Sequence, residues 1–173
     1  MIPVATSARA TRRVLLRRLA AGTTLGVLVG CGFELRRPPR LAFSTVALEG
    51  FAPRSPLAAE LRRTLAAQVR VLDDAARAQV VLQALDDRRE RSVVASTAAA
   101  QVRGLTLRLK FEFRVHTPAE RELLPRTALL LERDLSYSET FALAKEQEEA
   151  ELFRAMQDDV VAQVLRRLAS IAP

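Results

Sequence analysis

The most restrictive feature of this 173-residue chain is a strict alternation of apolar and polar side chains over residues 105–116. The apolar series is Leu105, Leu107, Leu109, Phe111, Phe113 and Val115. The polar series is Thr106, Arg108, Lys110, Glu112, Arg114 and His116. Successive side chains of a strand point to opposite faces, whereas a helix would spread this apolar series around its axis. The pattern predicts a long strand in a sheet with one buried face and one polar face.

Three further segments read as strands of the same sheet: residues 41–49, 79–85 and 128–137. The second can be extended through a charged run as far as Val94, and the small residues 95–101 are expected to form the next hairpin turn. The last has an apolar face consisting of Leu129, Leu131, Leu135 and Tyr137. Its opposite face carries Glu132 and Asp134, which can lie across from the arginines of the alternating strand.

Two amphipathic helices are expected to cover the apolar face of this sheet. The first begins after Ser55 and Pro56, which suit an N-cap and a first helical position. Its apolar residues recur every four positions as Leu57, Leu61, Leu65 and Val69. The second spans about residues 143–169 and has a nearly continuous i, i+3, i+4 apolar stripe. The order βαβββα predicts an α+β two-layer sandwich, with a four-stranded, mostly antiparallel sheet and both helices on one face.

Residues 1–30 have the composition of a signal peptide. Residues 1–18 contain five arginines and no acidic residue, and residues 19–30 are uncharged. The uncharged stretch is too short to span a bilayer. Arg12 and Arg13 fit a twin-arginine export motif, and an ordinary arginine-rich leader fits them equally well. We expect residues 31–40, which include Pro38 and Pro39, to be an extended tether, and residues 41–173 to be a single α+β domain.

Most of the net positive charge of the chain lies in residues 1–30. The formal net charge is +7, from 27 basic and 20 acidic residues. Residues 31–173 keep 22 basic and 20 acidic side chains, a net charge of +2. A nucleic-acid-binding domain would be expected to keep a larger basic excess.

No known catalytic pattern is visible in the sequence. The only histidine, His116, continues the polar face of a strand and is expected at the surface. We find neither a group of residues at metal-ligand spacing nor a glycine-rich phosphate loop. The chain is therefore expected not to be an enzyme and to need no metal or cofactor.

Leu28–Cys31 resembles the lipobox of bacterial lipoproteins. Cys31 is the only cysteine of the chain and directly follows the uncharged stretch. The resemblance implies cleavage after Gly30 and conversion of Cys31 to an N-palmitoyl, S-diacylglycerol cysteine. The alternative is a free, buried cysteine that follows an ordinary signal peptide.

From Cys31 to about Ile171 the chain resembles the lipopolysaccharide-assembly lipoprotein family LptE, also called RlpB. The resemblance rests on the order and spacing of short motifs: Cys31-Gly32-Phe33, Leu35-Arg36, Ala142–Lys145, an acidic patch before Met156, and Val164–Leu168. It implies a lipid-anchored protein of the outer membrane that lies inside the lumen of the LptD β-barrel. Such proteins plug that barrel, aid its assembly and bind lipopolysaccharide (LPS).

Gly32, directly after the expected lipid site, agrees with the outer membrane, because an Asp at this position commonly marks retention in the inner membrane. The residues also fit two alternative functions: an adaptor lipoprotein of an ABC-type lipid transporter, and a structural lipoprotein without a ligand.

Phosphate recognition in LPS would require arginine or lysine. The candidate LPS-binding residues are Lys145, Arg103, Arg108, Lys110 and Arg114. Lys145 matches the lysine of the family motif, and the others lie along or beside the polar face of the alternating strand. The competing interpretation is a solvated face neutralised by Glu112, Glu132 and Asp134. The expected hairpin tip, Ala98–Ala100, lacks the basic residue that the family often has nearby, so Arg103 or Arg91 is a possible substitute.

Overall fold

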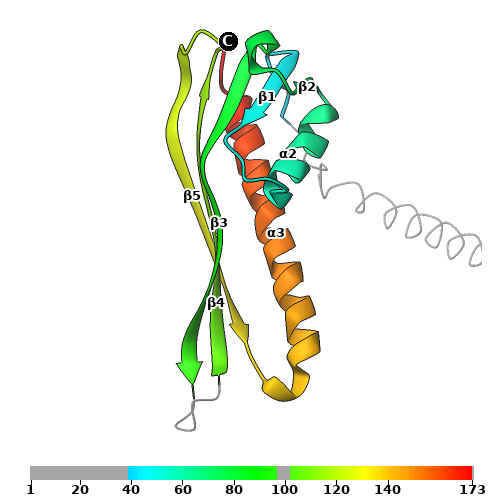
Figure 1. Ribbon diagram of the computed structural model, residues 1–173, viewed down its shortest axis with the longest axis vertical. Coiled ribbons are helices and arrows are strands. Elements are labelled where there is room, and N and C mark those ends of the chain that lie inside the picture. Colours follow the sequence, from blue (N-terminus) through cyan, green and yellow to red (C-terminus); the bar gives the residue numbers. More distant parts are fainter. Residues whose placement is uncertain (1–38, 97–101, 173) are drawn as a thin grey trace, which may run out of the picture. The chain divides into compact units, whose positions relative to one another are not determined.

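A mixed five-stranded sheet with two helices against one face forms the described part of the chain (Figure 1). The computed structural model describes residues 39–96 and 102–172. The predicted signal peptide, Cys31, most of the tether and residues 97–101 of the predicted hairpin turn lie outside the described residues. In chain order the strands and α-helices are β1 (Thr45–Glu49), α2 (Pro56–Ala66), β2 (Arg70–Leu72), β3 (Val80–Ser96), β4 (Val102–His116), β5 (Glu122–Ser136) and α3 (Ala142–Leu168).

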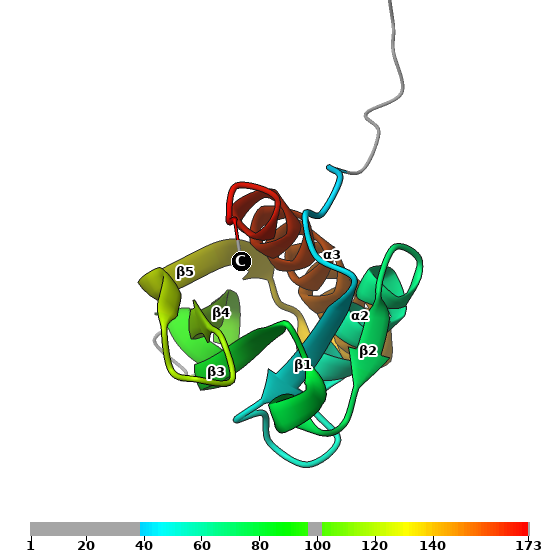
Figure 2. The same ribbon diagram turned by 90° about the horizontal axis from the view of Figure 1, so that it is seen from above.

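The predicted alternation of β4 is confirmed. All six apolar side chains of the series are at most 3% exposed. Phe111 and Phe113 are stacked, with ring centroids 5.2 Å apart, and Phe51 also stacks on Phe111, at 5.8 Å. These rings lie in one core with Leu57, Leu61 and Leu65 of α2 and with the apolar stripe of α3. Seen from above, α2 and α3 lie on the same side of the sheet, as predicted (Figure 2).

The sheet differs from the prediction in strand number and direction. Its order is β2-β1-β3-β4-β5, so it has five strands rather than four. The additional strand, β2, is only three residues long and therefore too short to show a periodicity in the sequence. It pairs with β1 in parallel, and β1 pairs with β3 in parallel. Only the β3–β4 and β4–β5 pairs are antiparallel, so the sheet is mixed rather than mostly antiparallel.

The charged run after Leu85 continues β3, and a bulge changes which of its side chains face the helices. Ala84 lies opposite the inward-facing Phe113, whereas Asp86 lies opposite the outward-facing Glu112. The extra residue reverses the alternation, because one inserted residue moves all later side chains to the other face. Asp87, Arg89 and Arg91 consequently face the helices, and Asp86, Arg88 and Glu90 face away from them.

A polar cluster joins β3 to both helices. The Ser55 hydroxyl caps α2 by accepting from the Ala58 amide at 3.1 Å, and it donates to Asp87 at 2.5 Å. Gln157 of α3 donates to the Pro56 carbonyl at 2.9 Å, and its side-chain oxygen accepts from Arg89. Because each of these buried or half-buried groups has a partner, the cluster sets how the two helices sit on the sheet.

Replacing Phe111 with alanine should lower the free energy of unfolding by about 3–5 kcal/mol, because it leaves a cavity among fully buried side chains. Urea denaturation followed by circular dichroism measures this change. The matched control is Phe141→Ala, at a ring that is 64% exposed, and it should change stability by less than about 0.5 kcal/mol. Equal effects of the two substitutions would contradict the assignment of the faces.

Candidate functional site

The outer face of the sheet carries a connected network of charged side chains. Arg88 donates twice to Asp86, at 2.7 Å in each bond. The Lys110 ammonium lies 3.1 Å from Asp86 and 3.3 Å from Glu112. Arg126 of β5 also donates to Glu112. Three cations and two carboxylates thus alternate across β3, β4 and β5.

The other two candidate cations of β4 are also paired. Arg108 donates to Glu132 at 2.6 Å, which confirms the predicted cross-strand pairing with β5. Arg114 donates to Gln83 at 2.5 Å and to Glu120 at 3.1 Å. Asp134, the other predicted partner of the arginines, accepts instead from the Thr106 hydroxyl at 2.6 Å.

These contacts shift the pKa values of the network in a consistent direction. The hydrogen bond from Arg88, aided by Lys110, lowers the pKa of Asp86. The hydrogen bond from Arg126, with Lys110 adding to it, lowers the pKa of Glu112. Hydrogen bonds to Asp86 and Glu112 raise the pKa of Lys110. Hydrogen bonds that favour the charged forms thus keep the network ionised at neutral pH.

Lys145 and Arg103 lie apart from this network, at the end of the domain where β4 begins and β5 ends. Gly104 pairs with Ser136, and the Arg103 carbonyl accepts from the Tyr137 amide at 3.0 Å. The Lys145 ammonium donates to the Ser136 hydroxyl at 3.2 Å and to Glu148 at 2.8 Å. The candidates therefore form two groups: Arg108, Lys110 and Arg114 on the outer face, and Arg103 and Lys145 at this distal end.

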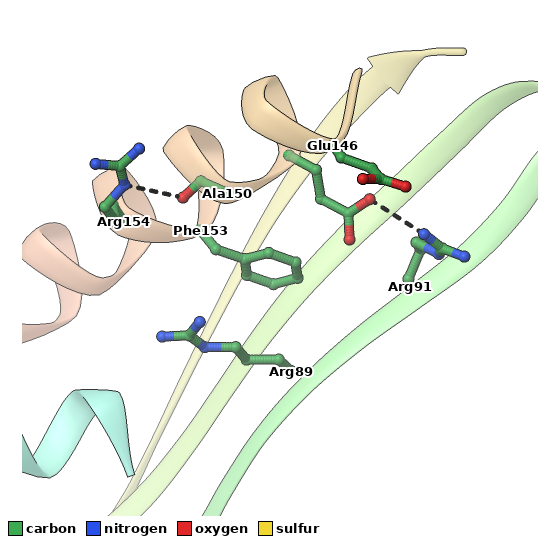
Figure 3. Close-up of a pocket in the computed structure, with 7 residues that line it drawn as sticks. Arg89, Arg91, Glu146, Ala150, Phe153 and Arg154 are labelled. Atoms are coloured by element: carbon green, nitrogen blue, oxygen red, sulfur yellow. Dashed lines mark hydrogen bonds and ion pairs between the residues drawn. The ribbon is translucent and has the colours of Figure 1, made fainter. Parts of the chain in front are cut away.

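A groove of about 480 Å³ lies between β3 and α3, and the sequence did not predict it (Figure 3). It is lined by Arg89, Arg91, Glu146, Glu149, Ala150, Phe153 and Arg154. In the close-up, Arg89 and Arg91 extend from β3 toward α3. The Arg91 guanidinium lies 3.3 Å from Glu149, and that of Arg89 lies 5.4 Å from the centroid of the Phe153 ring. The two arginines line the groove because of the bulge in β3, which leaves no signal in the hydrophobic pattern.

His116 is buried rather than exposed at the surface. It is 4% exposed, and its Nδ1 lies 2.8 Å from the Thr117 carbonyl oxygen. Its neighbour across the sheet, Val81, is also buried, so the outer face is covered at this end of β4. The alternation of β4 could not reveal this, because it reports which face a side chain is on and not what covers that face.

The described residues lack two features, a metal-binding group and a membrane-spanning helix. Within residues 39–96 and 102–172, no group of three or more histidine, cysteine, aspartate or glutamate side chains is arranged to hold a metal ion. No helix in the same ranges is long and apolar enough to cross a membrane.

Comparison with protein families identifies one match that spans most of the chain. The model of the LptE lipopolysaccharide-assembly family matches residues 43–168, from just before β1 to the last residue of α3. The comparison with curated proteins found no match.

Several solved structures share the fold. An uncharacterized lipoprotein B from Nitrosomonas europaea, solved by NMR, superposes with a TM-score of 0.66 at 26% identity, over 80% of this chain and 91% of that one. The crystal structure of the rare lipoprotein B from Shewanella oneidensis gives 0.60 at 24% identity, over 73% and 95%. A minor lipoprotein from Acinetobacter baumannii gives 0.61 at 23% identity, over 77% and 98%.

The outer-face network should make the free energy of unfolding decrease as the pH falls into the acid range. A carboxyl group whose pKa is lowered by folding stabilises the folded state above its unfolded pKa, about 4, and this contribution is lost as the pH falls through its folded pKa. We expect Asp86→Asn combined with Glu112→Gln to lower the free energy of unfolding at pH 7 and to weaken its decline below about pH 4.

Urea denaturation of both proteins at pH 7 and pH 3 measures this effect. The control is Asp73→Asn, which breaks an ion pair with Arg62 at a side chain that is 91% exposed, and it should leave the decline unchanged. An equal decline in the double variant and the unsubstituted protein would contradict the assigned role of the network.

Proposed function

The chain belongs to the LptE lipopolysaccharide-assembly family, and on that premise we propose that it is an outer-membrane lipoprotein that works with an LptD-type β-barrel. In this proposal it plugs the barrel lumen, aids assembly of the barrel and binds LPS on its way to the cell surface. The observation that carries the proposal is the family match, which includes every strand and both helices of the described domain.

The outer face of the sheet suits contact with the wall of such a barrel. The lumen of an outer-membrane barrel is lined by polar residues. Lys110, Arg108 and Arg114 are held at fixed positions by carboxylates or amides of neighbouring strands. A charged face with its side chains already paired can lie against a polar wall without burying an uncompensated charge.

Anchoring depends on Cys31, which lies outside the described residues. Cleavage after Gly30 and acylation of Cys31 would leave three acyl chains on the mature protein. A single chain gives only marginal membrane binding, so three chains should hold the protein permanently. The tether of residues 31–40 would then let the domain extend from the inner leaflet of the outer membrane into the barrel.

LPS binding is assigned first to the distal end. A phosphate that binds Lys110 must displace two carboxylates. At Lys145 it competes with one carboxylate, that of the half-exposed Glu148. Lys145 is therefore easier than Lys110 for a lipid A phosphate to recruit, and Arg103, which lies beside the same Ser136–Tyr137 segment, is the second candidate at this end. Arg108, Lys110 and Arg114 are retained as further candidates.

The proposal predicts that the full-length lipidated protein, tagged after Pro173, elutes with a large β-barrel protein from outer membranes dissolved in mild detergent. The eluate can be analysed by gel electrophoresis and mass spectrometry. The control is the same protein carrying Cys31→Ala, which should be missing from the outer-membrane fraction. Recovery of the lipidated protein alone, with no barrel, would contradict the proposed partnership.

Lys145→Asp combined with Arg108→Asp should weaken LPS binding by about tenfold or more, because each lost charge-assisted hydrogen bond contributes about 1.5–3 kcal/mol. Titration of the protein with purified LPS at low salt, with circular dichroism to verify folding, measures the effect. Arg62→Asp combined with Arg63→Asp on α2 makes the same change in net charge and serves as the matched control. Equal affinities of all three proteins at low salt would refute the assignment of these residues.

A further inference from the structure

The second half of β3, from Asp86 to Ser96, is an edge strand: it pairs with β4 on one side and with no strand on the other side within the described residues. On this side β1 pairs only with Val80–Gln83. Gly50, at φ +75°, turns the chain away from the sheet, and any Cβ on it would lie 2.2 Å from the Ala84 carbonyl oxygen. Within residues 39–96 and 102–172, no strand pairs with β3 on this side beyond Gln83 (Figure 1).

The open edge is regular enough to accept another strand. Residues 86–93 pair with residues 105–112 of β4 without a register shift, and the irregularities of β3 lie outside this segment. Eight residues extend about 26 Å and offer alternating N–H and C=O groups along their free side. The segment contains no proline, whereas β5, the strand at the other edge, contains Pro125, which cannot donate to a ladder.

The charged side chains of this segment are held on the two faces of the sheet. Asp86 and Arg88 are bound to each other on the outer face, and Arg91 is bound to Glu149 of α3 on the inner face. Val93, in contrast, is 57% exposed, and the adjacent Val94 is exposed to a similar degree. A strand added to the edge would cover these valines and would not have to displace the existing ion pairs.

The groove beside the edge indicates the charge of the added strand. Arg89 faces inward and has no carboxylate within ion-pair distance in the described ranges, since its partners are the Gln157 amide and the Phe153 ring. Side chains directly opposite each other on neighbouring strands interact, and opposite charges there are favourable. An acidic side chain opposite Arg89 would lie at the mouth of the groove, near the apolar surface of Phe153 and Ala150 (Figure 3).

We propose that residues 86–93 of β3 form a strand-addition site for an extended segment of the barrel partner, with an acidic residue opposite Arg89. Backbone hydrogen bonds would supply affinity, and the groove would select the side chains, as in other cases of β-augmentation. The inference rests on the proposed function because it takes the barrel as the partner.

Amide-resolved hydrogen exchange on the full lipidated protein, alone and in its purified complex with the barrel, tests the proposal. Free-side amides of Arg88–Val93 should exchange at least about tenfold more slowly in the complex, because strand addition gives them hydrogen-bond partners. Free-side amides of β5 serve as the internal control and should change much less. Unchanged exchange at Arg88–Val93, or equal slowing at both edges, would overturn the proposal.

A matched pair of substitutions gives an independent readout. Val93→Lys places on the open edge the residue that most often prevents strand addition, and should reduce the recovered barrel by about tenfold. Ala66→Lys adds the same charge at an exposed side chain of α2, away from residues 86–93 and from the outer face of the sheet, and should leave recovery unchanged. Equal recovery with both variants would overturn the strand-addition site alone. A failure of the unsubstituted protein to recover any barrel would overturn the proposed function and this site together.

Discussion

The apolar face of β4 has to be covered along its whole length, and most of the domain follows from that requirement. Fifteen residues of strand extend about 50 Å, and the 27 residues of α3 extend about 40 Å. One helix can therefore cover nearly all of the strand. Because α3 packs on β4 and β5, the other core helix, α2, is left to cover the part of the sheet that β1 completes.

The polar cluster around Gln157 decides how these layers meet. Hydrophobic burial is not directional, so an apolar stripe on α3 would permit several positions of the helix on the sheet. Gln157 reaches the first turn of α2 and also Arg89 of β3, and Asp87 reaches the cap of the same helix. A shift of either helix would leave buried polar groups without partners, at a cost of about 1–3 kcal/mol each. The same arrangement leaves the second half of β3, residues 86–96, and the groove beside it uncovered.

The outer face of the sheet serves a different purpose from the inner face. Its charges are neutralised within the domain, which keeps a broad sheet surface polar without making it a strong polyanion site. This agrees with the net charge of only +2 for residues 31–173. Under the proposed function, binding of an anionic lipid would therefore depend on cations with a single carboxylate partner, such as Lys145.

The sequence alone was sufficient to predict the strands and helices whose hydrophobic pattern is long and regular. The alternation of β4, the stripe of α3 and the cap of α2 at Ser55 are local patterns, so the α+β class and the inner face could be predicted. The cross-strand pair of Arg108 and Glu132 also followed from alternation. The family could likewise be predicted from short linear motifs, which need no tertiary information. The lipoprotein leader, which also rests on such motifs, lies outside the described residues and stays a prediction.

Only the tertiary structure decided the features that depend on contacts between distant residues. The three residues of β2 form a strand because β1 offers them a parallel edge, and such a short segment has no periodicity of its own. The bulge at Leu85 is flanked by contacts with distant residues: Gly50 lies close to Ala84, and Ser55 donates to Asp87. It turns Arg89 and Arg91 toward α3 and so creates the groove. One inserted residue reverses every side chain that follows it, and the hydrophobic pattern of a charged run cannot show where that residue lies.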